Sequence, residues 1–241
     1  MIRGVNTITP ATLKSLPMFH DCPAAVLARL LQGAGIEQCA KGRVLFLNGE
    51  PANSYFYIRS GWIKLFRETL DGDQAIVDIL PAGHLFGETA IFENGIYAYS
   101  AEMVEEGEVA RLPLRTLQDE IDRNHALALA MLKSMSRYRH EQEMEIEHRT
   151  LQSAPQRIGC FLLRLMNQHD SGPVTVHLPY DKTLLAARLG MQPETFSRAL
   201  ARLKKETGLE IRGSTVQARS FVQLSEYACA ACSSGFPCAD K

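Results

Sequence analysis

Short apolar and aromatic segments, separated by turn residues, fill residues 41–114 and restrict the fold more than any other feature. The segments span residues 43–47, 55–58, 62–66, 75–80 and 108–112. Glycine, proline, asparagine and aspartate stand between most of them, as they do in the turns of antiparallel sheets. This pattern predicts an antiparallel barrel or jelly roll of roughly 75 residues. Helix starts at Thr9-Pro10 and at Asp21 before Pro23 predict two short helices ahead of it.

A long helix is predicted to follow the barrel, from a cap at Asn124 to about Leu151. Six positions in it repeat with alternating spacings of three and four: Leu132, Met135, Arg139, Gln142, Ile146 and Arg149. This is the phase of a coiled-coil seam, so we interpret the segment as a dimerisation helix with a polar lower half. The alternative is a helix packed against its own domain.

Beyond a boundary at 153–155, the chain predicts two short helices, 182–189 and 193–205, joined by a turn through Gly190. This arrangement is the signature of a helix-turn-helix, and a hairpin over 209–217 would form its wing. The alternative is an ordinary helical pair with a charged exterior.

The second of these helices has two distinct faces. Its inward anchors are predicted to be Phe196, Leu200 and Leu203, at i, i+4 and i+7. Glu194, Ser197 and Arg198 project elsewhere, near the end where a recognition helix meets base edges. Arginine can bond guanine at two atoms and glutamate can accept from cytosine, so we predict base contacts there. Four basic side chains are expected to bind phosphates: Lys182, Arg202, Lys204 and Lys205.

Charge is distributed unevenly along the chain, in agreement with the predicted base and phosphate contacts. Residues 1–150 hold 15 Lys and Arg against 20 Asp and Glu, whereas 151–241 hold 11 against 7. Between Lys182 and Arg219 there are eight basic and three acidic residues, an excess that suits a polyanion. A solvated basic face is the plainer interpretation.

Taken together, the barrel with Gly61 and the stretch 83–88, the long helix and the motif Glu194-Thr-Phe-Ser-Arg198 resemble the CRP/FNR family of bacterial transcription regulators. The resemblance covers roughly residues 15–225 and implies an α+β fold: a cyclic-nucleotide-binding-like jelly roll, a dimerisation helix and a C-terminal winged helix-turn-helix. We expect a sensor domain over 1–123, the dimerisation helix over 124–152, the DNA-binding domain over 153–225 and a cysteine-rich tail over 226–241.

The resemblance also implies partners. A homodimer would place two recognition helices on double-stranded DNA at a palindromic operator, and RNA polymerase is expected from the family. Ser197 stands where the cyclic-AMP branch carries glycine, so the motif is similar to the FNR and DNR branches. Those branches bind inverted repeats close to TTGAT and ATCAA.

The effector pocket of such a barrel would involve Gly87, Glu88 and His84. Cyclic-nucleotide members clamp the phosphate with an Arg-Ser pair, but 95–101 contains no arginine. A buried phosphate without a cation would be poorly compensated, so we do not expect cyclic AMP. Heme is a rival sensor, because DNR-like relatives bind it and detect NO, and His84 is its first candidate ligand.

Three cysteines, Cys229, Cys232 and Cys238, are spaced C-x2-C-x5-C near the C-terminus. Closely spaced cysteines bind iron–sulfur clusters and zinc. The tail resembles that of a minority of FNR-like regulators, which carry a C-terminal cysteine triplet with a carboxylate as fourth ligand, and this implies a [4Fe-4S] cluster responsive to oxygen, NO or redox state. Zinc, thiol chemistry or an unremarkable tail are the alternatives. Glu141, Glu145 and His148 are candidates for a fourth ligand, against the simpler view that each belongs to a solvated face.

Two other functions are weighed. A metal-dependent jelly-roll enzyme would need clustered histidines on barrel strands, but His84 is the only histidine between Lys41 and Leu114, so we expect no catalysis. A regulatory subunit that does not bind DNA is disfavoured by the basic segment 182–219. No run approaches the ~18 apolar residues of a membrane span, and we expect a cytoplasmic protein without a membrane partner.

Overall fold

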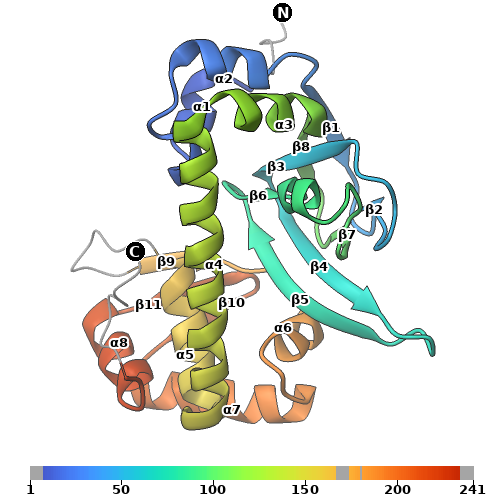
Figure 1. The fold of residues 1–241 in the computed structure, drawn as a ribbon. Coiled ribbons are helices and arrows are strands. Elements are labelled where there is room, and N and C mark those ends of the chain that lie inside the picture. Colours follow the sequence, from blue (N-terminus) through green and yellow to red (C-terminus); the bar gives the residue numbers. More distant parts are fainter. Residues whose placement is uncertain (1–7, 167–173, 180, 234–241) are drawn as a thin grey trace, which may run out of the picture. The chain divides into compact units, whose positions relative to one another are not determined.

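The computed structural model describes residues 8–166, 174–179 and 181–233. The chain divides into two compact units, Met1–Ser136 and Arg137–Lys241, each treated separately below. The division falls inside one long helix, α4 (His125–Leu151), which contributes to both units (Figure 1). Among the described residues, no helix combines the length and the apolar character needed to cross a lipid bilayer.

The first unit opens with three short helical segments: α1 (Pro10–Lys14), η1 (Pro17–Phe19) and α2 (Ala24–Leu30). Thr9 caps α1 by accepting from the Thr12 backbone N–H at 3.3 Å, which confirms the predicted start at Thr9-Pro10. Asp21 does not cap α2. Pro23 takes the N-cap position, and Asp21 instead lies 2.9 Å from His20 Nδ1. Figure 1 shows α1, α2 and α3 (Leu114–Arg123) together at one end of the barrel.

Two antiparallel four-stranded sheets form the barrel, in the orders β1-β8-β3-β6 and β2-β7-β4-β5. The strands are β1 (Gly35–Cys39), β2 (Val44–Phe46), β3 (Ser54–Ser60), β4 (Trp62–Glu68), β5 (Gln74–Pro81), β6 (Leu85–Phe86), β7 (Ser100–Met103) and β8 (Gly107–Pro113). Five match the predicted segments. The sequence pattern missed β1, β6 and β7, because they are short or carry several polar residues and show little apolar periodicity.

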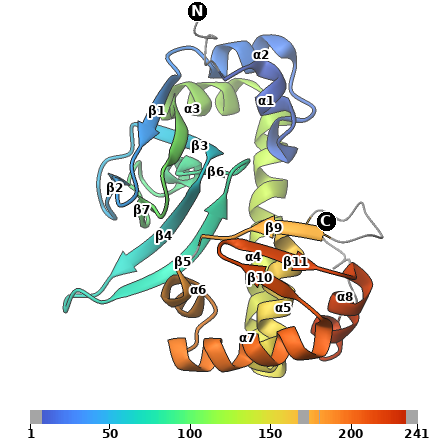
Figure 2. The ribbon, with the colours of Figure 1, turned by 180° about the vertical axis from the view of Figure 1, so that it is seen from behind.

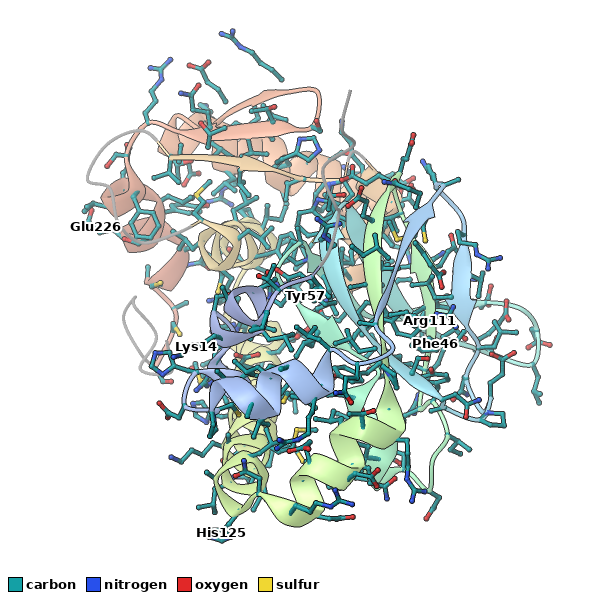
Figure 3. All side chains as sticks on the ribbon, turned by 90° about the horizontal axis from the view of Figure 1, so that it is seen from above. Lys14, Phe46, Tyr57, Arg111, His125 and Glu226 are labelled. Atoms are coloured by element: carbon teal, nitrogen blue, oxygen red, sulfur yellow. The ribbon has the colours of Figure 1, made fainter. Side chains whose placement is uncertain are left out.

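Aromatic side chains fill much of the barrel core. Phe46 stacks on Tyr97 with ring centroids 3.7 Å apart and also packs against Phe56 and Phe86. Arg111, labelled with Phe46 in Figure 3, lies with its guanidinium carbon 5.4 Å from the Phe56 ring centre. These aromatic rings fill the centre of the first unit.

Helix α4 is apolar on more than one side. In the first unit it buries Leu127 and Met131, and in the second it buries Met144 and His148. Its exposed apolar residues are Leu129, Leu132, Met135, Tyr138, Ile146 and Leu151. Asn124 caps it, accepting from the Ala126 N–H at 3.1 Å, as predicted.

In the second unit, α5 (Ala154–Leu165) begins with a capping box in which the Ser153 N–H donates to Gln156 Oε1 at 2.9 Å. The helix-turn-helix pair is α6 (Lys182–Arg188) and α7 (Pro193–Thr207). The wing is a three-stranded sheet in the order β10-β11-β9: β9 (Val174–His177), β10 (Glu210–Arg212) and β11 (Thr215–Ala218). Figure 2 shows α7 and the last helix, α8 (Phe221–Cys229), flanking α5.

Helix α8 was not anticipated, since the segment from 226 was assigned to a cysteine-rich tail. It packs closely on α5: a side chain at Gly159 would meet Ala228 Cβ at 3.0 Å. Residues up to Cys229 therefore belong to the packed second unit rather than to a loose extension.

Candidate nucleic-acid interface and sensor site

Helix α7 is anchored by one face. Phe196 and Leu203 are buried as predicted, but the third anchor is Ala199, while Leu200 is only half-buried. The helix starts at Pro193 behind a Gln192 cap, and Gly208 ends it in the left-handed region at φ 66°. Because the apolar face of α7 packs into the second unit, the opposite face of the helix is exposed to solvent.

The three predicted base-contact residues lie together on that outer face. Glu194, Ser197 and Arg198 are all exposed and occupy positions i, i+3 and i+4 in the first turns of α7. Within the described residues no ion pair engages Glu194 or Arg198. Both groups are therefore presented to solvent where a recognition helix contacts bases.

The four predicted phosphate-binding residues are exposed as well, but they are not equivalent. Lys182 opens α6 beside the Asp181 cap, and Lys204 and Lys205 occupy the last turn of α7. Arg202 forms an ion pair with Glu206 at 2.8 Å, which raises the pKa of the Arg202 guanidinium. Phosphate binding by Arg202 would have to compete with that carboxylate.

An ion pair that the sequence did not reveal joins the helix-turn-helix to α4. Arg188, at the end of α6, binds Glu145 at both carboxylate oxygens, with Nη2 2.9 Å from Oε2. Arg149 adds a second contact to Glu145 at 2.8 Å. Burial alone would raise the pKa of Glu145, but the two arginines outweigh it and lower that pKa. The position of α6 thus depends on a charged side chain of α4.

In the barrel, the predicted effector residues are only partly brought together. Gly87 adopts φ 84°, which favours glycine, and its N–H donates to Tyr99 Oη at 3.1 Å. Glu88 follows with a buried Oε2 that has no hydrogen-bond partner among the described residues, and burial raises the pKa of this carboxyl. His84 is exposed, with Nδ1 3.2 Å from Pro81 O.

Of the two described tail cysteines, Cys232 contacts helix α4. Cys229 ends α8, and Cys232 Sγ is 3.3 Å from His148 Nε2. The other ring nitrogen, Nδ1, is 3.7 Å from Cys160 Sγ. His148 is 5% exposed, and burial together with the charge of Arg164 lowers the pKa of its imidazole. Cys160 is buried and contacts this histidine.

Further contacts hold the tail in place. Glu147 accepts from Ser233 at both oxygens, from the backbone N–H at 2.8 Å and from Oγ at 2.9 Å. Gln152 Nε2 donates to Ala228 O at 3.3 Å. Cys238 lies outside the described residues. Across the described ranges, no three His, Cys, Asp or Glu side chains converge as a metal site.

Comparison with known proteins defines the class. A cyclic nucleotide-binding domain model matches residues 36–124, and a Crp-like helix-turn-helix domain model matches 156–227. The two matches coincide with the barrel and with the α5–α8 region. This is the architecture of a DNA-binding transcription regulator with an attached effector-type domain.

Relatives place the chain within that class. The fumarate and nitrate reduction regulatory protein of Escherichia coli (strain K12) is 30% identical over 192 residues, covering 78% of this chain and 76% of the relative. The cyclic AMP receptor protein of Thermus thermophilus is 27% identical, covering 90% and 98%. A crystal structure from Ruegeria pomeroyi DSS-3, provisionally described as cyclic nucleotide binding, has a TM-score of 0.70 and 32% identity over 91% of this chain and 96% of its own. The chain belongs to the CRP/FNR family of transcription regulators.

Proposed function

We propose that this protein is a homodimeric regulator that binds an FNR-like palindromic operator and responds to oxygen, NO or redox state through a [4Fe-4S] cluster held by Cys229, Cys232 and Cys238. The observation that carries the DNA-binding half is the exposed trio Glu194, Ser197 and Arg198 at the start of α7. The observation that carries the sensor half is the docking of Cys232 against α4. RNA polymerase is the expected protein partner, and the cytoplasm the expected location.

The preference for one DNA sequence would come from hydrogen bonds to base edges in the major groove. Arg198 matches the O6 and N7 acceptors of guanine, and Glu194 matches the N4 donor of cytosine, each worth about 1–3 kcal/mol of discrimination. Lys182, Lys204 and Lys205 add sequence-independent phosphate contacts. Arg202 would contribute after exchanging Glu206 for a phosphate.

A dimer would bury the exposed apolar side chains of α4. Leu132, Met135 and Ile146 belong to the predicted seam and are 59%, 39% and 67% exposed in the single chain. A second copy would cover them and bring two recognition helices to a separation of about 34 Å, one helical turn of DNA. Apolar side chains exposed in this register are what a parallel helix pair requires.

The route from sensor to DNA would run through the last turns of α4. This segment touches the tail through His148 and Glu147 and holds Arg188 of α6 through Glu145. A change in the tail that shifts these turns would shift α6, and with it the helix-turn-helix. Sensing and DNA binding would thus share one short stretch of helix.

DNA binding is tested with two variants on a specific and a scrambled duplex. Arg198→Ala should lose preference at one base pair, by about 5- to 150-fold, because one bidentate contact is removed. Lys204→Ala, its matched control, should weaken both duplexes alike and reduce the salt dependence. Equal losses on both duplexes for Arg198→Ala would contradict the base-contact assignment.

The sensor is tested by anaerobic purification with an absorption spectrum and iron and sulfide analysis. The cysteine thiolates of the tail suit iron–sulfur chemistry, and such a cluster supplies a reversible redox and gas response. A broad visible band with acid-labile sulfide supports the proposal. A sharp Soret band would instead support the alternative, a DNR-type heme regulator with His84 as the first ligand to replace, and zinc without iron would support a zinc site.

A further inference from the structure

We propose that a cavity between α4, α5 and the end of α6 is a binding site for a small oxyanion that carries a hydroxyl group, with the size and chemistry of hydrogen phosphate. All of its lining residues belong to the second unit, and none is a predicted DNA contact or a tail cysteine. The inference therefore goes beyond the proposed function and does not depend on it. It follows from the charge of the cavity walls, two polar atoms without partners and the size of the cavity.

The walls of the cavity carry more positive than negative charge. They include four guanidinium groups and one carboxylate: Arg149, Arg157, Arg164, Arg188 and Glu145. The carboxylate of Glu145 is already shared between Arg149 and Arg188. Arg157 and Arg164 form no ion pair within the described parts of the chain. An anion in the cavity would compensate these two charges, and guanidinium groups bind oxyanions well.

The surroundings of Arg157 disfavour its charge. Burial and the charge of Arg149 both lower the pKa of this guanidinium. Its Nη1 donates to Leu189 O at 3.3 Å, but its Nε is buried without a hydrogen-bond partner among the described residues. Because arginine keeps its proton in proteins, the charge has to be stabilised by a partner instead. A bound anion would supply both a negative charge and an acceptor.

A second unpartnered atom adds a requirement for a donor. Gln152 also lines the cavity, and its Nε2 donates to Ala228 O at 3.3 Å, while its Oε1 is buried without a partner among the described residues. Buried polar atoms are commonly paired with protein groups, water or an ion. Arg157 Nε needs an acceptor and Gln152 Oε1 needs a donor. Hydrogen phosphate offers both, whereas sulfate has no hydroxyl at neutral pH and can pair only with the arginine.

The size of the cavity limits what it can hold. The volume open to the centre of a water-sized sphere is about 40 Å3. One water needs about 10–15 Å3 by this measure, so the cavity has room for roughly three or four groups of that size. This matches the oxygens of one tetrahedral oxyanion and is too small for a nucleotide.

Binding is tested by adding inorganic phosphate to the full chain at neutral pH, with the ionic strength held constant by chloride. Urea unfolding followed by circular dichroism should show a higher midpoint for the second unit, because a ligand that binds the folded state stabilises it. Trp62 lies in β4, so its fluorescence reports the barrel, where the midpoint should shift far less. This comparison corrects for the general stabilisation of proteins by phosphate. Sulfate should raise the second-unit midpoint less than phosphate.

Variants locate the site, with phosphate affinity measured by calorimetry. Arg164→Gln removes a guanidinium, and Arg157→Lys keeps the charge but removes the Nε donor. Each should weaken phosphate binding at least tenfold, as expected when one charge-assisted hydrogen bond is lost. Gln152→Met should remove the preference for phosphate over sulfate. Arg212→Gln is the matched control, because this arginine has an 88% exposed side chain in β10 and does not line the cavity, so its loss should leave phosphate affinity unchanged.

Three outcomes would overturn the inference. The first is wild-type protein whose second-unit midpoint does not rise with phosphate. The second is phosphate binding that persists unchanged in both Arg164→Gln and Arg157→Lys, since the anion would then bind elsewhere. The third is equal affinity of wild-type protein for phosphate and sulfate, which contradicts the need for a hydroxyl and needs no variant to fold. Each measurement uses protein without DNA, so the Arg198 series and the iron and sulfide analysis judge the proposed function separately.

Discussion

The two units of the molecule differ in what fills the space between their elements. The centre of the barrel is packed with aromatic rings, and ion pairs such as Lys64–Glu102 join its neighbouring strands. In the second unit, charged and polar side chains of α4 contact α5, α6 and α8. Both units bury polar atoms without hydrogen-bond partners among the described residues, such as Glu88 Oε2 in the barrel and Gln152 Oε1 in the second unit. Polar contacts of α4 therefore define how the helices of the second unit meet, while the centre of the barrel is apolar.

This difference helps to decide which of the two units contains the sensor. A change of ligand or redox state acts on a structure only through groups whose interactions differ between two states. In the second unit, the tail contacts and the α6 contact share a short segment of α4, so a change at one can alter the other. In the barrel, the aromatic cluster occupies the core and 95–101 contains no arginine for a phosphate. The comparison favours the tail over the barrel as the sensor.

The largest expected effect comes from breaking the Glu145–Arg188 pair. Arg188 and Glu145 have 8% and 17% exposed side chains, and Arg149 still contacts Glu145 when Arg188 is removed, so Arg188→Ala should destabilise the second unit by about 1.5–3 kcal/mol. Urea unfolding followed by circular dichroism measures this. The only tryptophan, Trp62, lies in β4, and the transition followed by its fluorescence, which reports the barrel, should not move.

A control and a pH series sharpen this prediction. Arg202→Ala breaks an exposed ion pair and should leave the urea midpoint of the second unit nearly unchanged. Because the folded-state pKa of Glu145 is lowered, its stabilisation is complete above the unfolded value of about 4.3 and is lost as pH falls through the folded pKa. Similar losses for both arginine variants would mean that the buried pair does not hold α6.

A smaller effect of opposite sign is expected in the barrel. Glu88→Gln should stabilise this unit by up to about 1 kcal/mol at neutral pH, because burial disfavours the ionised form of a carboxyl whose Oε2 has no hydrogen-bond partner among the described residues. Burial raises the folded-state pKa of Glu88, so barrel stability should fall as pH rises from about 4.3 through that pKa, and the variant should lose this dependence. Trp62 fluorescence in urea at several pH values measures both. A variant less stable than wild type would indicate that Glu88 has a stabilising partner.

The smallest expected effect is that of cyclic AMP. A ligand at a hundred times its Kd stabilises the folded state by about 2.7 kcal/mol, and we expect no such shift in the Trp62 transition. A clear stabilisation of the barrel by cyclic AMP would mean that the barrel binds the effector. The preference for the tail as the sensor would then be wrong.

Local sequence patterns predicted many of the elements. Turn residues between apolar runs gave five barrel strands, Asn124 marked the start of α4, and Gly190 separated α6 from α7. The exposed face of α7 was predicted from spacing alone, since one turn of helix fixes which residues share a side. Leu200 was misplaced because positions i+3 and i+4 both lie on the side of Phe196, and only the packing of the helix decides which of the two is buried.

The amino-acid sequence by itself determined the order of the elements, the two-faced α7 and the positions of the cysteines, because periodicity and capping act over a few residues. Only the tertiary structure decided that His148 lies between Cys160 and Cys232 and that Glu145 binds Arg188. These partners are separated by 12, 84 and 43 positions, and no local pattern encodes such pairs. Packing of α4, α5, α6 and α8 brings them together.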